Sequence, residues 1–577
     1  MRETSSPRRL RLDGSMRRVP LLGVLPALAA SLMCGGMTVH PQPEAPPPEH
    51  EALAPAVWTA SAMERVFRRD PPRPLRGATL FAARGEYEAF QIVVHAPGGA
   101  LTGVEVSASD LVAPTGQSLP AATFSVFREQ YVDVPRSSHA PTRGNHPEPP
   151  GAYPDALVPM AAAGTPRLGV PAGENQPFWI DVRVPRGVAP GLHTGTVTVT
   201  TDQGRVSVPV SLTIWDFDLP AVPSLRSSFG LTGPRLRDEA YQRLLLEHKV
   251  MPTHVSAAAA RTLRARGLNV AGLEYWSDQD GCAMKPPPSG DALRKAVAAY
   301  PSGLDLYVYV ADEPLAKCDD PARITPKIAA WARSAHAARA KALVTIPPRP
   351  ELLDDGTGRS SVDVWVMLPN QLDAADPAQV EARRHGDELW WYTALAQDAY
   401  SPKWLLDYAP INYRIGTGFI AQSLGLAGVL YWAVDHWSGD PWADVYYREG
   451  SASWAGEGLL VYPGEPAGAD GPVPSMRLKW IREGVEDFEY VELLKRRGRG
   501  AFALEVARSV GADWRSWTKD PGALEQARMR LGQELDRLGT RPDGARIEPT
   551  SVRAVDAPPE RATRKDTSGT ARRVRGQ

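Results

Sequence analysis

The chain divides into regions with different patterns of hydrophobic and polar residues. Between residues 57 and 220, short runs alternate apolar and polar side chains, as at residues 194–200 and 205–215. Such alternation predicts half-buried strands, and the turn residues at 200–204 predict a hairpin between these two runs. We therefore expect residues 57–220 to form a β-sandwich domain.

Residues 221–498 carry longer apolar runs that alternate with stretches of helical periodicity. The runs predict buried strands at residues 227–231, 253–256, 304–311, 342–346, 362–368, 388–393 and 428–434. Helices are predicted between several of them, at residues 238–249, 326–340 and 412–424. This alternation is typical of a (β/α)8 barrel. Because no GxGxxG motif follows a strand, a nucleotide-binding sheet is disfavoured.

The pattern beyond the last strand is helical and then irregular. A long helix is predicted at residues 475–497, where Arg482 and Glu486 are four positions apart and would pair on its surface. Residues 499–540 predict a helical extension, and residues 541–577 have no apolar periodicity and are expected to be disordered. The expected fold is therefore multidomain β + α/β, with the sandwich followed by the barrel and C-terminal helices.

The first 36 residues have the pattern of an export signal. Arg17 and Arg18 precede an apolar stretch at residues 19–33 that is too short to span a bilayer securely. Cys34 ends a stretch similar to a lipoprotein box, whereas residues 27–29 offer an ordinary signal-peptidase site, and both alternatives stay open. Residues 37–56 are rich in proline and predict an extended tether. We expect an exported protein, in the periplasm, at the cell surface or outside the cell, attached to the membrane only if Cys34 is lipidated.

Composition and charge exclude several classes of function. A chain of 577 residues is too long for a single core. Its formal net charge is −1 and its basic residues are scattered, so we expect no nucleic-acid partner. No Cys/His cluster has metal-ligand spacing, and no metal or organic cofactor is indicated. Cys282 and Cys318 can pair in an oxidising compartment or remain free thiols.

Two adjacent acids, Asp312 and Glu313, end the apolar run at residues 304–311, and Pro314 follows them. The carboxyl ends of barrel strands are where α/β barrels keep their chemistry. An acid before proline is also an ordinary helix start, so a capping role is the alternative. Consecutive strand residues point to opposite faces, and both acids can reach one ligand only where the strand bends. Pro314 disfavours helical geometry at Glu313 and makes such a bend plausible.

Several segments resemble glycoside hydrolase family 123. They are residues 309–314 (Tyr-Val-Ala-Asp-Glu-Pro), 363–366, 389–393 and 428–437. Residues 458–464, 474–477 and 482–490 are similar to the C-terminal module catalogued as domain of unknown function 4091. The resemblance covers residues 57–497 and implies a β-sandwich before a (β/α)8 barrel.

The resemblance implies a retaining, exo-acting β-N-acetylgalactosaminidase that uses substrate-assisted catalysis. Carried over to this chain, Glu313 is the general acid that protonates the glycosidic oxygen, and Asp312 orients the 2-acetamido group of the sugar. The acetamido oxygen then attacks the anomeric carbon, so no second carboxylate is needed as nucleophile. The expected partner is a glycan with a terminal β-linked N-acetylhexosamine. N-acetylgalactosamine is the first candidate and N-acetylglucosamine stays open.

Further candidate residues follow the predicted strands or match family-like positions. Aromatic rings at strand ends can stack on a sugar or pack in the core, and polar residues there can bind hydroxyls. The candidates for substrate binding are Trp391, Tyr392, Trp432, Asp435, Trp437, His254 and Arg414. The family more often has Asn near Asp435, which leaves the sugar preference open.

Two other functions compete with this hypothesis. One is a carbohydrate-binding surface protein that keeps the barrel but does not turn over substrate. The other is a glycosidase for a sugar that lacks the acetamido group, with another carboxylate such as Asp435 as nucleophile.

Overall fold

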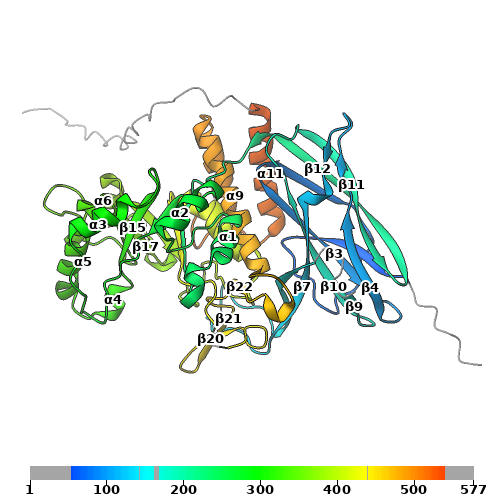
Figure 1. Cartoon of the computed structure of the whole chain (residues 1–577), viewed down its shortest axis with the longest axis horizontal. Helices are drawn as coiled ribbons and strands as arrows, with labels where there is room; N and C mark the ends of the chain where they lie inside the picture. Colours follow the sequence, from blue (N-terminus) through cyan, green and yellow to red (C-terminus); the bar gives the residue numbers. More distant parts are fainter. Residues whose placement is uncertain (1–53, 142, 161–167, 438, 540–577) are drawn as a thin grey trace, which may run out of the picture. The chain divides into compact units, whose positions relative to one another are not determined.

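The computed structural model describes residues 54–141, 143–160, 168–437 and 439–539. The expected export signal with Cys34, the tether up to residue 53 and the tail at 541–577 lie outside the described residues. The described residues belong to one compact unit, which Figure 1 shows coloured along the sequence. No helix within the described part has both the length and the apolar character that crossing a membrane requires.

The amino-terminal part is a sandwich of two sheets. One sheet has the order β1 (Ala56–Ser61), β3 (Tyr87–His95), β10 (Asn175–Arg183), β7 (Phe124–Val134) and β8 (Gly151–Pro159). The path of the other is β2 (Ala78–Arg84), β12 (Gly204–Asp218), β11 (Gly191–Thr201), β4 (Leu101–Ala108) and β9 (Leu168–Val170), with β5 (Leu111–Val112) and β6 (Ser118–Leu119) beside it. The predicted hairpin is β11–β12, which turns between Thr201 and Gly204.

Apolar side chains from both sheets form the core of the sandwich. Ile92 and Phe178 come from the first sheet, and Val197 and Val208 come from the second. All four side chains are buried, because alternate residues of each strand face the opposite sheet.

The second half contains a parallel sheet of seven strands. Its order is β13 (Arg226–Phe229), β19 (Gly428–Tyr431), β18 (Glu388–Tyr392), β17 (Val364–Met367), β16 (Lys341–Val344), β15 (Asp305–Ala311) and β14 (Val270–Gly272). Helices separate these strands along the chain, namely α1 (Glu239–Glu247), α2 (Ala257–Leu263), α3 (Gly290–Ala298), α4 (Pro314–Lys317), α5 (Pro321–Ala337), α6 (Pro377–His385), α7 (Ile411–Ile415) and α8 (Ala421–Leu424). A π-helical turn at Gly416–Ile420 joins α7 to α8, so the predicted helix at 412–424 is nearly continuous.

The sheet is nearly closed, which corrects the expectation of a complete (β/α)8 barrel. Residues 252–254 lie between the edge strands β13 and β14, and they pair only through the isolated bridges Phe229–Pro252 and His254–Gly272. The predicted strand at 253–256 is therefore not a full strand. Pro252 has no N–H to donate to a ladder, which limits regular pairing there. The three-residue strand β14 was not predicted, because so short a run has no measurable periodicity.

Alternation along β18 sorts its side chains between the two faces of the sheet. Trp390 packs against Tyr307 of β15 with ring centroids 6.4 Å apart, and Gly428 leaves room for its indole. Trp391 points to the other face, where a Cβ on Gly416 would lie 2.8 Å from its ring. Tyr392 is again on the face of Trp390, at the carboxyl end of the strand.

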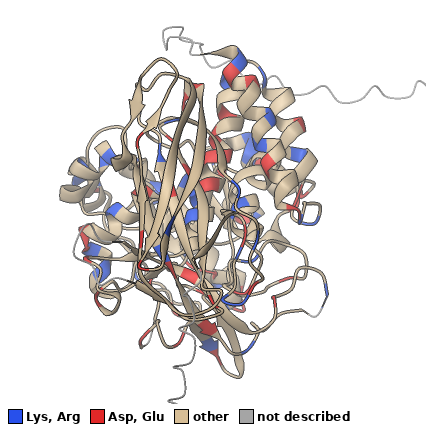
Figure 2. Cartoon of the chain, turned by 90° about the vertical axis from the view of Figure 1, so that its right-hand side faces the viewer, with Lys and Arg blue, Asp and Glu red and all other residues tan. Residues whose placement is uncertain are grey.

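The long helix α9 (Met476–Arg496) is buried between the sandwich and the parallel sheet, and α10 (Gly500–Val510) and α11 (Pro521–Leu538) follow it (Figure 1). Figure 2 shows acidic and basic residues interspersed in the helices and the sandwich. Arg482 pairs with Asp181 of β10 at 2.9 Å, and Glu486 pairs with Lys249 at 2.8 Å. The predicted surface pair between Arg482 and Glu486 is therefore wrong, because this helix has no open face there.

Candidate active site

Asp312 and Glu313 lie at the carboxyl end of β15, where the chain bends sharply. Glu313 has φ 44° and ψ 51°, in the left-handed region that non-glycine residues rarely occupy. The short helix α4 starts at Pro314, yet the Glu313 side chain makes no capping hydrogen bond. Strained backbone of this kind is a feature of functional sites. The capping interpretation is therefore wrong for the side chain of Glu313.

The carboxylate of Glu313 reaches across the open end of the sheet. Its Oε1 accepts a hydrogen bond from the Tyr392 hydroxyl at 2.5 Å, and its N–H donates to Thr345 Oγ1 at 2.6 Å. Tyr392 is on β18, and two strands separate β18 from β15 in the sheet. The carboxylate of Glu313 therefore lies over the interior of the sheet. Burial, together with the hydrogen bond to Glu313, raises the pKa of Tyr392 and keeps it a donor.

Asp312 is held by donors from three directions. Its Oδ1 accepts from the Tyr309 hydroxyl at 2.8 Å and from Thr345 Oγ1 at 3.1 Å. Its Oδ2 accepts from Lys317 Nζ at 2.6 Å. Burial, followed by the charge of Asp312, raises the pKa of Tyr309, so this hydroxyl also remains protonated. These contacts fix the orientation of the Asp312 carboxylate.

The loop after β14 contributes two residues that sequence reasoning missed. Gln279 accepts the Asp312 N–H on Oε1 at 2.9 Å, and its Nε2 is buried without a partner among the described residues. Trp276 is 40% exposed, and its ring centroid lies 5.3 Å from that of Tyr309. An exposed indole close to the two acids can stack on the apolar face of a sugar. The sequence did not single out Trp276 and Gln279, because the strand that precedes their loop, β14, was not predicted.

The two neighbouring aromatic candidates on β18 have different environments. Tyr392 reaches the acid pair as described above, so the structure brings it into the site. Trp391 is fully buried on the helix side of the sheet, with ring centroids 5.4 Å from Trp404 and 4.9 Å from Trp514. The expectation that Trp391 binds substrate is therefore corrected, because its ring belongs to the core.

The two aromatic candidates after β19, Trp432 and Trp437, also have different environments. Trp432 is 36% exposed and donates its indole N–H to Glu457. Trp437 is half-buried beneath the guanidinium of Arg235, whose carbon lies 4.4 Å from the ring centroid. Trp432 thus keeps an open face beside the strand that carries Tyr392, whereas Trp437 is covered on one side.

Asp435 does not face a ligand. It is fully buried, and its carboxylate accepts from the Thr232 N–H at 2.9 Å and from Arg235 Nε at 2.6 Å. Its role is to fasten the segment after β13 to the segment after β19. This placement corrects the expectation that Asp435 binds hydroxyls, and it removes the support for Asp435 as a nucleophile.

The contacts of Arg414 and His254 are with residues other than the acid pair. Arg414, on α7, is buried and pairs with Asp487 at 2.7 Å and with Glu525 of α11. The expectation that Arg414 binds substrate is corrected, because buried acids already neutralise its charge. His254 lies in the segment that bridges β13 and β14, and burial lowers its pKa. No hydrogen bond within the described part of the chain connects His254 to Asp312 or Glu313.

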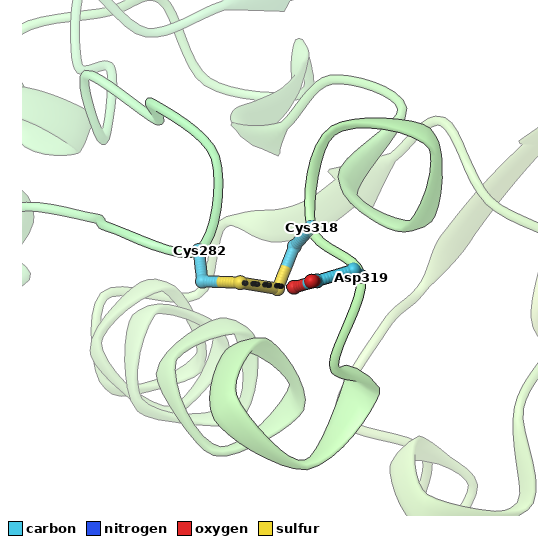
Figure 3. A group of neighbouring side chains, drawn as sticks. All are labelled: Cys282, Cys318 and Asp319. Atoms are coloured by element: carbon cyan, nitrogen blue, oxygen red, sulfur yellow. Dashed lines mark hydrogen bonds between the residues drawn. A yellow bond between two sulfur atoms is a disulfide. The ribbon is translucent and has the colours of Figure 1, made fainter. Parts of the chain in front are cut away.

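Cys282 and Cys318 form a disulfide bond, which decides between the two alternatives left open by the sequence. The bond joins the loop that carries Trp276 and Gln279 to the residue that follows α4 (Figure 3). Asp319 lies beside it, with Oδ1 3.8 Å from Cys282 Sγ. These three side chains have the proximity of a metal site, but sulfurs in a disulfide are not thiolate ligands.

Comparison with known proteins places the chain in a family. The model of the glycoside hydrolase 123 catalytic domain matches residues 304–494, which include the acid pair and nearly all of α9. The model of the glycoside hydrolase 123 N-terminal domain matches residues 63–201 in the sandwich. Together the two models cover more than half of the chain. No curated protein matches the chain.

One solved structure supports the same fold. A family 123 glycoside hydrolase from Clostridium perfringens, described in a study of glycolipid glycan hydrolysis, has a TM-score of 0.61 at 13% identity, covering 84% of this chain and 98% of that chain. A GH10 xylanase from termite gut has a TM-score of 0.27 at 12% identity, over 54% of this chain and 90% of that one. A β-glucuronidase from Parabacteroides merdae has a TM-score of 0.25 at 10% identity, over 60% and 45%. The last two similarities are too low to carry an argument.

Proposed function

We propose, from the premise that the chain belongs to glycoside hydrolase family 123 and is a glycoside hydrolase, that it removes terminal β-linked N-acetylhexosamine from glycans. N-acetylgalactosamine is the preferred sugar in this proposal. The reaction is exo-acting, proceeds with retention of configuration, and uses the 2-acetamido group of the substrate as the nucleophile.

The observation that carries the proposal is the bend at Glu313, which brings two consecutive carboxylates to the same end of the sheet with different partners. Asp312 is fixed by Tyr309, Thr345 and Lys317, which suits a group that must orient an amide. Glu313 accepts one hydroxyl on Oε1, and its Oε2 has no donor within the described part of the chain. That free oxygen suits a group that must deliver a proton to a leaving group.

The residues divide the proposed reaction between them. Protonated Glu313 gives its proton to the glycosidic oxygen as the bond to the anomeric carbon breaks. The acetamido oxygen forms the new bond to that carbon, and Asp312 accepts a hydrogen bond from the amide N–H. Water then attacks the anomeric carbon, Glu313 takes its proton, and the acetamido group is released. Trp276 and Trp432, the exposed rings at this end of the sheet, are proposed to receive the apolar face of the sugar.

Export is part of the proposal. The disulfide between Cys282 and Cys318 supports it, because such bonds persist mainly in oxidising compartments. Whether Cys34 carries a lipid is a separate question that labelling with a fatty-acid analogue in a native host would answer.

The test compares three chromogenic substrates: β-N-acetylgalactosaminide, β-N-acetylglucosaminide and plain β-galactoside. We expect hydrolysis of the first and little or none of the third. Glu313→Gln and Asp312→Asn should each lower kcat by about 10²- to 10⁴-fold, because each removes a group that acts in the transition state. Hydrolysis of the plain galactoside alone would contradict the acetamido mechanism. Binding of all three without hydrolysis would favour the carbohydrate-binding alternative.

A further inference from the structure

A buried carboxylate lies directly behind the exposed ring of Trp432. Glu457 Oε1 accepts the indole N–H of Trp432, and Glu457 Oε2 accepts the Leu395 N–H at 2.9 Å. Trp432 follows β19 and Leu395 follows β18, which are neighbours in the sheet. One carboxylate therefore ties together two loops at the end of the sheet that carries the acid pair.

The turn at residues 456–458 is shaped around this indole. Gly458 has φ +69°, and a Cβ there would lie 2.5 Å from Trp432 Cζ2, so no larger residue fits. Its N–H donates to the Tyr431 hydroxyl at 2.9 Å. The indole is thus held at its N–H by Glu457 and contacted along its six-membered ring by the backbone of Gly458.

The same turn is anchored from behind by the helix and the sandwich. The Gly456 carbonyl accepts from Arg477 Nη1 at 2.9 Å, and Arg477 pairs with Asp155 of β8 at 2.7 Å. All of these groups are buried. A rigid connection therefore runs from the sandwich through α9 to the turn, which gives the sandwich a part in shaping the site.

The burial of Glu457 calls for a reason. Trp432 is 36% exposed, whereas Glu457 is only 2% exposed. Burying a carboxyl group is unfavourable, and apolar residues of similar volume often stabilise a protein as well as a buried polar pair does. A carboxylate whose two oxygens meet an indole N–H and a loop N–H fixes direction, which an apolar side chain cannot do.

We propose that Glu457 is a positioning residue, which holds the Trp432 indole so that its open face meets the sugar bound at Asp312 and Glu313. This inference rests on the proposed function. Glu457 acts through Trp432 and touches no reacting atom. Its removal should therefore weaken substrate binding and change KM far more than kcat.

The hold on Trp432 should also depend on pH. Burial raises the pKa of Glu457 to about 7, although Trp432, Leu395, Arg477 and Tyr431 oppose the shift. An ionised carboxylate is the stronger acceptor, so the indole should be held less firmly as the pH falls through this value. Burial, followed by the charges of Glu449 and Glu457, raises the pKa of nearby Tyr447, so this ring stays neutral in the same range. The ring of His436 packs on Trp432 with centroids 4.8 Å apart.

The first measurement needs no substrate. The fluorescence difference between the protein and its Trp432→Phe variant isolates the emission of Trp432, and we expect it to change with a midpoint near pH 7. Glu457→Gln should abolish the change and Glu457→Asp should retain it, whereas His436→Asn should leave the midpoint in place. An unchanged titration in Glu457→Gln, or its loss in His436→Asn, would overturn the assignment to Glu457.

The second measurement uses the chromogenic β-N-acetylgalactosaminide. We expect Glu457→Gln to raise KM about five- to tenfold with kcat within about twofold, and to add nothing to Trp432→Ala in the double variant. A large fall in kcat, or no change in KM, would overturn the proposal. If the unmodified protein hydrolyses none of the substrates, the proposed function fails, while the fluorescence titration still decides whether Glu457 holds Trp432.

Discussion

The two ends of the parallel sheet use the same strands for different purposes. At the amino end, Arg226, Asp305, Lys341 and Glu388 are the first residues of β13, β15, β16 and β18. Asp305 pairs with Arg226 at 2.8 Å and with Lys341 at 3.1 Å, and Glu388 pairs with Lys341 at 2.7 Å. Two cations and two anions balance there, and each already has a partner.

The carboxyl end has no such balance. Its hydroxyl groups, from Tyr309, Thr345 and Tyr392, direct their hydrogen bonds toward Asp312 and Glu313. The basic group that contacts the pair, Lys317, comes from α4 rather than from a strand. At the amino end, the charged side chains pair with one another and join neighbouring strands. At the carboxyl end, two adjacent carboxylates are held mainly by hydroxyl groups, at the edge where parallel α/β sheets bind ligands.

The largest effects should come from replacing one glutamate with glutamine at each end of the sheet, Glu313 at the carboxyl end and Glu388 at the amino end. Glu313→Gln should lower kcat about 10³-fold and leave the unfolding free energy nearly unchanged. Glu388→Gln should lower the unfolding free energy by about 2 kcal/mol, since it leaves Lys341 short of a partner in a partly exposed pair, and should leave kcat of the folded fraction unchanged. Urea unfolding and initial-rate kinetics on both variants check this. A loss of stability in the first, or of kcat in the second, would break the distinction between the ends.

The next effect concerns the disulfide bond between Cys282 and Cys318, which joins two loops at the carboxyl end of the sheet. Replacing both Cys282 and Cys318 with Ser should lower the unfolding free energy by about 4 kcal/mol on the chain-entropy model, because the bond spans 36 residues. KM should also rise, because the loop with Trp276 and Gln279 loses its attachment. Thermal unfolding and kinetics of the oxidised and reduced protein test this. An unchanged KM would mean that hydrogen bonds alone hold the loop.

A smaller effect on kcat should distinguish the hydroxyl group of Tyr392, which contacts Glu313, from that of Tyr307, which does not. Tyr392→Phe should lower kcat about tenfold, because Glu313 loses the donor that orients it. Tyr307→Phe is the matched control, since the Tyr307 hydroxyl donates a hydrogen bond to Ser228 Oγ at 2.8 Å and does not contact the acid pair. Its kcat should stay the same. Equal losses in both variants would show that the hydroxyls act only through packing.

The smallest expected effect is the pH dependence of the amino end. Burial disfavours the charge of Asp305, but Lys341 and Arg226 outweigh it and lower the pKa of Asp305. A lowered folded pKa gives stability that is present above the unfolded value and is lost as the pH falls through the folded value. Asp305→Asn should therefore destabilise by about 0.5–1 kcal/mol at pH 7, a figure reduced for solvent screening, and by less near pH 3. A penalty equal at both pH values would contradict this sign.

Some features follow from the sequence because they depend on neighbours along the chain. The strand predicted at 304–311 became β15 (Asp305–Ala311), and the helix predicted at 475–497 became α9 with Ser475 as its cap. Asp312 and Glu313 were found because they end such a run before a proline. Periodicity and turn chemistry are local, so the sequence alone can carry them.

Other features depended on partners that are distant in the sequence. Trp391 and Tyr392 look equivalent in the chain, yet one packs in the core and the other reaches Glu313. Asp435 and Arg414 resembled ligand-binding residues until Arg235 and Asp487 proved to neutralise them. Which face a side chain takes, and which charge balances it, is set by long-range packing. The sequence by itself thus determined most of the longer elements and singled out the acid pair, while the tertiary structure decided which residues surround that pair.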